Sequence, residues 1–151
     1  MKKLLLLILL IITSFVLAQE QMMVRPKLLV QKPPQYPADA QKLRVEGTVL
    51  LNATVGTDGK VKMAEFESAE FIYSGGTKVV RSAGELESLP SPFKEAAESL
   101  IKSAKTSARI WKFTPAMLEG ESIEATIRIP FNFDLRILPV KPGKNGPPKK
   151  K

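Results

Sequence analysis

The chain has 151 residues and a net charge of +8, and it contains neither histidine nor cysteine. A chain of this length holds one modest domain with appendages. The missing residue types exclude disulfides, thiolate nucleophiles, zinc sites built from Cys or His, and catalytic triads that use histidine. We therefore predict a non-enzymatic protein with no catalytic residue, no metal and no cofactor.

The positive charge is concentrated at the two ends of the chain. Of the 23 lysines and arginines, two lie at positions 2 and 3 and five lie between positions 141 and 151, which leaves 16 basic against 15 acidic residues. A nucleic-acid-binding surface needs basic residues gathered on the folded domain itself. The body of this chain is nearly neutral, so we predict no nucleic-acid partner.

Residues 1–18 have the pattern of an export leader. Two lysines precede an apolar run of 15 residues from Leu4 to Ala18, and Val16-Leu17-Ala18 resembles a cleavage site. A bilayer-spanning helix needs roughly 20 apolar residues. A cleaved signal peptide is the first interpretation, and a short uncleaved membrane anchor is the alternative. Both predict export from the cytoplasm.

Residues 19–35 are predicted to form a linker, because they are polar, mixed in character and contain Pro26, Pro33 and Pro34. A short helix is predicted to follow over residues 38–43. Pro37 would take its first position, where the missing N–H costs nothing.

Two strands and a turn are predicted next. Residues 47–55 alternate between apolar and polar, and Asp58-Gly59 is a strong hairpin signal before a second strand over 61–67. The apolar phase of that second strand changes, which predicts a bulge near Ala64-Glu65. Residues 69–90 give little signal beyond a small extra hairpin around Gly75-Gly76.

The main helix is predicted to begin at Ser91-Pro92, with Ser91 as N-cap and Pro92 at the first position. Apolar residues then recur at helical spacing on one side. They are Phe93, Ala96, Ala97, Leu100, Ile101 and Ala104.

The last predicted strand, residues 124–135, has the longest alternation in the chain, with apolar residues at every odd position from 125. Pro130 lies between them, and proline belongs on edge strands because it cannot donate to a ladder. We therefore predict a sheet edge on which even-numbered residues direct their backbone groups outward.

Together these elements predict an α+β fold in two layers: a three-stranded antiparallel sheet packed on one main helix, with a short N-terminal helix (order α-β-β-α-β). The domain is predicted to span residues 36–138, and residues 139–151 form a basic tail predicted to be disordered.

Several short sequences in this order resemble the C-terminal domain of TonB proteins over roughly Lys32 to Leu135. They are Tyr36-Pro37 with Ala40, residues 45–49, Thr57-Asp58-Gly59-Lys60-Val61, Trp111-Lys112-Phe113-Thr114-Pro115-Ala116, Gly120, and Ile129-Pro130-Phe131-Asn132-Phe133. The resemblance implies a periplasmic domain that grips outer-membrane transporters, whose N-terminal box adds as a strand to the last strand of the sheet.

The resemblance also implies which residues bind this partner. One group lies on the last strand and the other just before the Tyr-Pro pair. The predicted partner-binding residues are Glu124, Thr126, Arg128, Asn132 and Asp134, together with Lys32, Pro33, Pro34 and Gln35.

Two departures from the TonB pattern bear on function. The anchor helix of the family usually carries a histidine that couples to an inner-membrane motor, and this chain has none. The predicted spacer has 17 residues and reaches about 60 Å at full extension, which is short for a link between two membranes. Contact with motor proteins is therefore expected only if the leader stays as an anchor in the inner membrane.

Two further interpretations stay open at this point. The same fold can serve a structural envelope protein that binds wall glycan or an assembly partner without transducing energy. The domain can also dimerise by pairing its own sheet edges.

Overall fold

The computed structural model describes residues 22–137. The predicted leader, residues 1–18, and the predicted basic tail, residues 139–151, lie outside the described residues.

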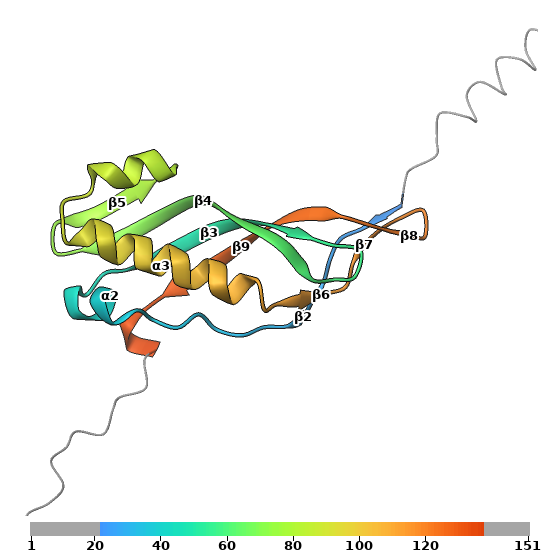
Figure 1. Ribbon diagram of the computed structural model, residues 1–151, viewed down its shortest axis with the longest axis horizontal. Coiled ribbons are helices and arrows are strands. Elements are labelled where there is room, and N and C mark those ends of the chain that lie inside the picture. The colour runs from blue at the N-terminus through green and yellow to red at the C-terminus, as the bar shows by residue number, and fades with distance from the viewer. Residues whose placement is uncertain (1–21, 138–151) are drawn as a thin grey trace, which may run out of the picture.

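The main sheet is antiparallel and has four strands in the order β5-β4-β3-β9 (Figure 1). The strands are β3 (Glu46–Val55), β4 (Val61–Tyr73), β5 (Gly76–Val80) and β9 (Ala125–Phe133). The predicted α+β class is confirmed, and the sheet has one strand more than the three predicted. The additional strand arises because β4 continues through Tyr73 and pairs with β5, which forms the small hairpin expected around Gly75-Gly76.

The β3–β4 hairpin turns at Gly56–Gly59, as the Asp-Gly signal predicted. The predicted bulge near Ala64-Glu65 is wrong, because Ala64 and Glu65 pair regularly with Ala53 and Asn52. The register instead shifts on either side of this position, where it passes over Lys62 and over Glu67. These two shifts keep the buried side chains of this long strand on the core side.

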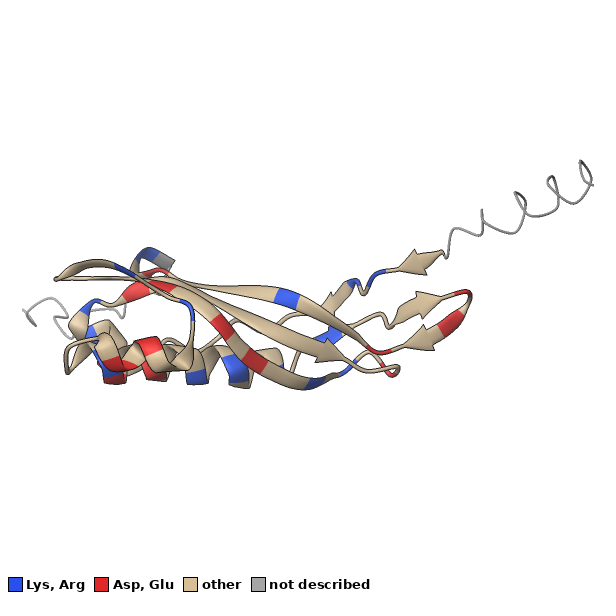
Figure 2. Cartoon of the chain, turned by 90° about the horizontal axis from the view of Figure 1, so that it is seen from above, with Lys and Arg blue, Asp and Glu red and all other residues tan. Residues whose placement is uncertain are grey.

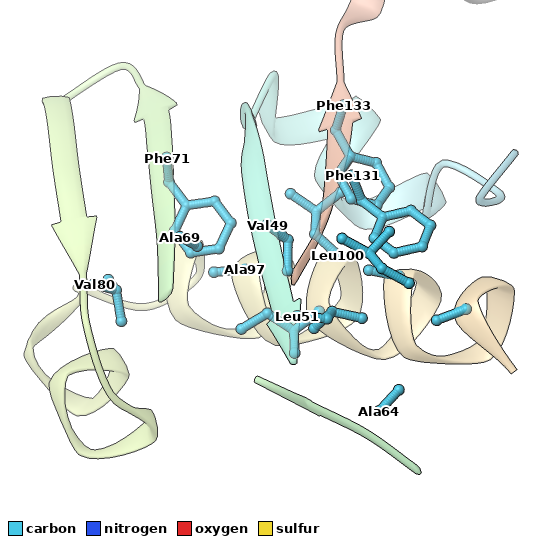
Figure 3. Packing of buried hydrophobic residues seen from close by; sticks show 14 of the residues in the cluster. Val49, Leu51, Ala64, Ala69, Phe71, Val80, Ala97, Leu100, Phe131 and Phe133 are labelled. Carbon is cyan, nitrogen blue, oxygen red and sulfur yellow. The ribbon is translucent and has the colours of Figure 1, made fainter. Parts of the chain in front are cut away.

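Helix α3 (Phe93–Ala108) covers one face of the sheet, and helix α2 (Ala38–Leu43) lies beside it. The core lies between these layers, as Figure 3 shows for Leu51, Leu100 and Phe131. Two predicted helix starts are off by one residue. Pro92 and Pro37 occupy the N-cap positions, and the Ser91 hydroxyl donates to Glu95 Oε1 (3.0 Å) rather than capping the backbone.

The other face of the main sheet carries no helix in the described part of the chain. The 3-10 helices η1 (Ala83–Ser88) and η2 (Leu135–Ile137) lie at the ends of β5 and β9. The even-numbered residues of β3 face this side and are half-buried, while its odd-numbered residues from Val49 are buried under α3.

The segment before residue 36 runs along the domain and forms two short strands, in a range predicted to be linker. Strand β1 (Met23–Val24) pairs with β7 (Ala116–Leu118), which also pairs with β8 (Glu121–Ile123). Strand β2 (Leu28–Val30) pairs with β6 (Lys112–Phe113). In Figures 1 and 2 the end formed by β1, β7 and β8 projects beyond α3.

Candidate partner-binding site

Strand β9 forms one border of the main sheet. All nine of its residues pair with β3, from Val55↔Ala125 to Gly47↔Phe133, and no other strand of the described residues pairs with it. Pro130 therefore lies on an edge strand, as predicted. One whole side of the β9 backbone is available for a further strand.

The position of Pro130 determines which backbone groups face outward. Pro130 lies opposite Leu50, and because proline has no N–H, this cannot be a pair that exchanges two hydrogen bonds. Such pairs alternate along an antiparallel ladder. Ile127, Ile129 and Phe131 therefore bond inward to β3, and the even-numbered residues of β9 direct their N–H and C=O groups to the open edge.

The side chains of these even-numbered residues lie on the uncovered face of the sheet. The Thr48 hydroxyl donates to Asn132 Oδ1 (2.7 Å), and the hydroxyls of Thr54 and Thr126 lie 3.3 Å apart. Arg128 Nη2 lies 2.8 Å from Glu67 Oε1. Thr126, Arg128 and Asn132 are exposed, so the structure brings these three predicted residues together along one edge.

Glu124 and Asp134 flank the two ends of β9 and are both engaged in ion pairs. Glu124 pairs with Lys62, which raises the pKa of the lysine. Two hydrogen bonds from the Arg136 guanidinium to Asp134 measure 2.7 and 3.0 Å. Hydrogen bonding to the Arg136 side chain lowers the pKa of Asp134 to about 2. The carboxylates of Glu124 and Asp134 therefore lie at the two ends of β9 and already have ion-pair partners.

The second predicted group, Lys32 to Gln35, forms a segment that we call the strap, held against α3 by its backbone. The Lys32 carbonyl accepts hydrogen bonds from Ser107 Oγ and from Trp111 Nε1 (2.8 Å), and the Gln35 carbonyl accepts one from Ser103 Oγ. Within the strap, Lys32, Pro33 and Gln35 are exposed and Pro34 is half-buried.

Aromatic contacts hold the strap beside β9. The rings of Trp111 and Phe131 have centroids 4.9 Å apart, and Tyr36, directly after the strap, meets Phe133 edge-on at 5.6 Å. Both aromatic partners lie on β9, and Figure 3 shows them on the α3 side of the strand. The two predicted groups, distant in sequence, therefore border the same side of the domain.

Two hollows lie near the predicted residues, the first beside the strap and the second beside the end of β9. One has a volume of about 440 Å³ and lies between the strap and α3, lined by Lys32, Gln35, Lys102 and Thr106 among others. The other, about 270 Å³, lies at the C-terminal end of β9 and is lined by Glu46, Glu70, Asn132, Asp134 and Arg136 with others. No three acidic side chains of residues 22–137 lie close enough to share a metal ion.

Ser103 and Ser107 are site residues that the sequence reasoning missed. Four residues separate them, so both lie on one side of α3, and Trp111 follows shortly after the end of this helix. A serine repeated at this spacing beside an apolar stripe was the available signal. It does not reveal the acceptors, which are backbone carbonyls 68 and 75 residues earlier.

Tyr36 carries a buried hydroxyl group that is sensitive to alkaline pH. Its hydroxyl donates to the Val45 carbonyl (2.6 Å). Burial, followed by the nearby charges of Glu46 and Asp134, raises its pKa from 10.0 to about 12. The unfolded chain releases this proton at lower pH than the folded chain, so the contribution to stability is complete below pH 10 and is lost as the pH rises towards 12.

Replacing Tyr36 by phenylalanine is expected to lower the free energy of unfolding by about 1 kcal/mol at neutral pH, because the buried bond to Val45 is lost. The difference from the wild type should shrink between pH 10 and pH 12. Urea unfolding at several pH values measures both effects. Tyr73→Phe, which removes the only other tyrosine, is the control and should retain the alkaline loss of stability.

The fold defines a class of small α+β domain in which the long strand β9 borders the main sheet and a segment from before the domain is tied down beside it. The family described as Gram-negative bacterial TonB protein C-terminal matches residues 32–68 and 78–135, and the chain belongs to this family. The match begins at the strap and ends just after β9. Its gap covers the end of β4 and the turn into β5. Comparison with curated proteins gives no match.

Membership of this family implies a TonB-like interaction with outer-membrane transporters in the cell envelope, and a non-catalytic role in coupling energy to transport. No specific partner is identified by the match. No helix within residues 22–137 is long and apolar enough to cross a membrane.

Proposed function

We propose that this chain is a periplasmic binding module that takes up the N-terminal box of an outer-membrane transporter as an additional strand on β9. The observation that carries the proposal is the edge itself: β9 is paired with β3 over its full length and with no second strand of the described residues. Main-chain hydrogen bonds would supply affinity in this mode, and the flanking side chains would supply selectivity.

The edge divides into two parts for such a partner. Thr126, Arg128 and Asn132 each offer an outward N–H, whereas Pro130 offers only its carbonyl. A bound strand therefore gains bonds on both sides of Pro130 and leaves one of its own carbonyls without a donor there. The same gap disfavours pairing between two copies of β9, since each copy would meet the break of the other.

The strap would contribute side-chain contacts to the same partner. It is fixed by its carbonyls, and Lys32, Pro33 and Gln35 remain exposed beside the edge. A strand added to β9 would direct alternate side chains towards this layer of the domain.

Coupling to an inner-membrane motor would in addition require that the leader stays as an anchor.

The decisive experiment follows amide hydrogen exchange by NMR, with and without a synthetic peptide carrying a transporter N-terminal box. In the free protein the amides of Thr126 and Arg128 should exchange rapidly, and those of Ile127 and Ile129 slowly. The peptide should slow the first pair and leave the second unchanged. Unchanged exchange at the outward amides with saturating peptide would contradict strand addition.

A matched pair of variants tests the backbone contribution. Arg128→Pro removes one outward N–H, and Arg128→Ala removes the same side chain and its ion pair but keeps the N–H. We expect Arg128→Pro to weaken peptide binding by about fivefold to tenfold, the equivalent of one hydrogen bond. Arg128→Ala should change it by less than about threefold, because exposed ion pairs contribute little.

Capture from envelope extracts decides between this function and the structural alternative. Recovery of outer-membrane transporters supports the transporter-binding module. Recovery of wall glycan without transporters would favour an envelope protein that uses the fold without transducing energy.

A further inference from the structure

One end of the molecule carries an apolar surface that strand addition at β9 does not use. Among the described residues, ten large apolar side chains are exposed, and six of them belong to residues 22–30. Strands β1 and β2 are exposed at every position because no layer covers either of their faces. A gathering of exposed apolar residues in one segment of a protein makes that segment a candidate site of interaction.

The part of this surface around β2 is also basic. Leu28 and Val30 pair with Phe113 and Lys112 of β6. The backbone of Lys112 also forms an isolated antiparallel β-bridge with that of Lys60. Ile110, also exposed, lines the same hollow as Lys32. We call this surface the β2 patch, and its members are Lys27, Leu28, Leu29, Val30, Lys60, Ile110 and Lys112.

Acidic residues are scarce around the patch. None occurs between residues 22 and 38 of the sequence. Asp58, the acidic residue beside Lys60, is paired with it at 3.2 Å. Glu119 and Glu121 lie at the β7–β8 turn, beside β1 rather than β2. The three lysines of the patch therefore present a net positive charge around exposed leucine, isoleucine and valine.

We propose that the β2 patch docks on the surface of a phospholipid bilayer that contains anionic headgroups. Apolar side chains ringed by lysines match such a surface, because the first enter the boundary of the acyl chains and the second meet the headgroup charges. Leu29 is the most accessible apolar residue of the patch, being 64% exposed and without a register partner on β6.

A leader that stays uncleaved would add support for a lipid occupant. The predicted apolar leader ends at Ala18, and only three residues separate it from Met22. Three residues span roughly 10 Å, so a retained leader would hold this end of the domain at the membrane. Docking would then keep the β2 end on the bilayer, while the edge of β9 extends away from it.

The test uses residues 19–137, which contain every described helix, strand and core residue and omit both the apolar leader and the basic tail. Sedimentation with vesicles of phosphatidylethanolamine and phosphatidylglycerol should show binding that weakens with added salt. Vesicles of phosphatidylcholine alone should bind less. Lack of sedimentation with the anionic vesicles at low salt would overturn the proposal.

Matched variants locate the binding surface. Leu29→Ser with Ile110→Ser should weaken binding by at least about tenfold. Ile72→Ser with Val79→Ser changes two apolar residues of similar exposure elsewhere and should leave binding unchanged. Lys27→Gln with Lys112→Gln should weaken it by about fivefold for each charge, and Lys42→Gln with Arg81→Gln by much less. Equal losses in test and control variants would contradict the assignment.

A fluorescent label separates lipid contact from self-association. The chain has no cysteine, so Leu29→Cys and Val79→Cys each give one labelling site for an environment-sensitive dye. Vesicles should shift the emission to shorter wavelength at position 29 only. A shift at position 29 that depends on protein concentration without vesicles would show a second copy on the patch and would overturn the proposal.

Discussion

Replacement of Phe131 by alanine is expected to lower the free energy of unfolding by about 3–5 kcal/mol. Phe131 is 2% exposed, and its ring lies 4.9 Å from the ring of Trp111 at a tilt of 48°; Trp111 in turn holds the strap. Truncation removes buried apolar area and leaves a cavity where β9 meets α3. Denaturant unfolding followed by circular dichroism measures the loss.

Pro130→Ala is the control for this substitution. Pro130 is the exposed neighbour of Phe131 on the same strand, so its replacement should change stability by no more than about 1 kcal/mol in either direction. A loss below about 1 kcal/mol for Phe131→Ala would contradict the packing described between β9 and α3.

Gly59→Ala is expected to be the most damaging change in the turns, with a loss of about 2–4 kcal/mol. Gly59 has a φ of +77°, and an added Cβ would lie 2.1 Å from the Phe113 carbonyl oxygen. The Gly59 carbonyl also accepts the N–H of Phe113 (2.8 Å), which ties the hairpin tip to β6. To relieve the clash between the new Cβ and the Phe113 carbonyl, the hairpin tip must move away from β6 and break this hydrogen bond. Thermal unfolding monitors the result.

Gly76→Ala separates backbone strain from the clash. Gly76 has a φ of +113° but no atom within 4 Å of an added Cβ. Its replacement should cost only the strain of the left-handed conformation, about 1–2 kcal/mol. Equal losses at the two positions would mean that the close approach of the hairpin tip to β6 does not contribute.

The elements that face a core on one side were predictable from the sequence. Strand β3, helix α3 and strand β9 each bury one side of an amphipathic pattern, and burial selects apolar residues at the corresponding period. Pro130 also indicated that β9 lies at the edge of the sheet, because proline lacks an N–H in any structure. Thr126, Arg128 and Asn132 could therefore be placed before the structure was known.

Strands β1 and β2 could not be predicted in the same way. Both are exposed on two faces, so nothing selects an alternation, and the run from Met22 to Val30 reads as irregular. The bulge in β4 was misplaced because two register shifts, at Lys62 and Glu67, produce a pattern that one shift between them imitates. The helix starts were misplaced by one residue, which is the usual precision of helix boundaries.

The way in which the strap is attached has a consequence for divergence between related chains. The groups that Ser103, Ser107 and Trp111 bind are carbonyl oxygens of the main chain, and every amino acid supplies the same carbonyl. We therefore expect substitutions at positions 32–35 to alter the exposed surface of the strap without loosening its attachment. The attachment of the strap and its exposed surface can therefore change separately: the first depends on side chains in and just after α3, and the second on four residues more than sixty positions away.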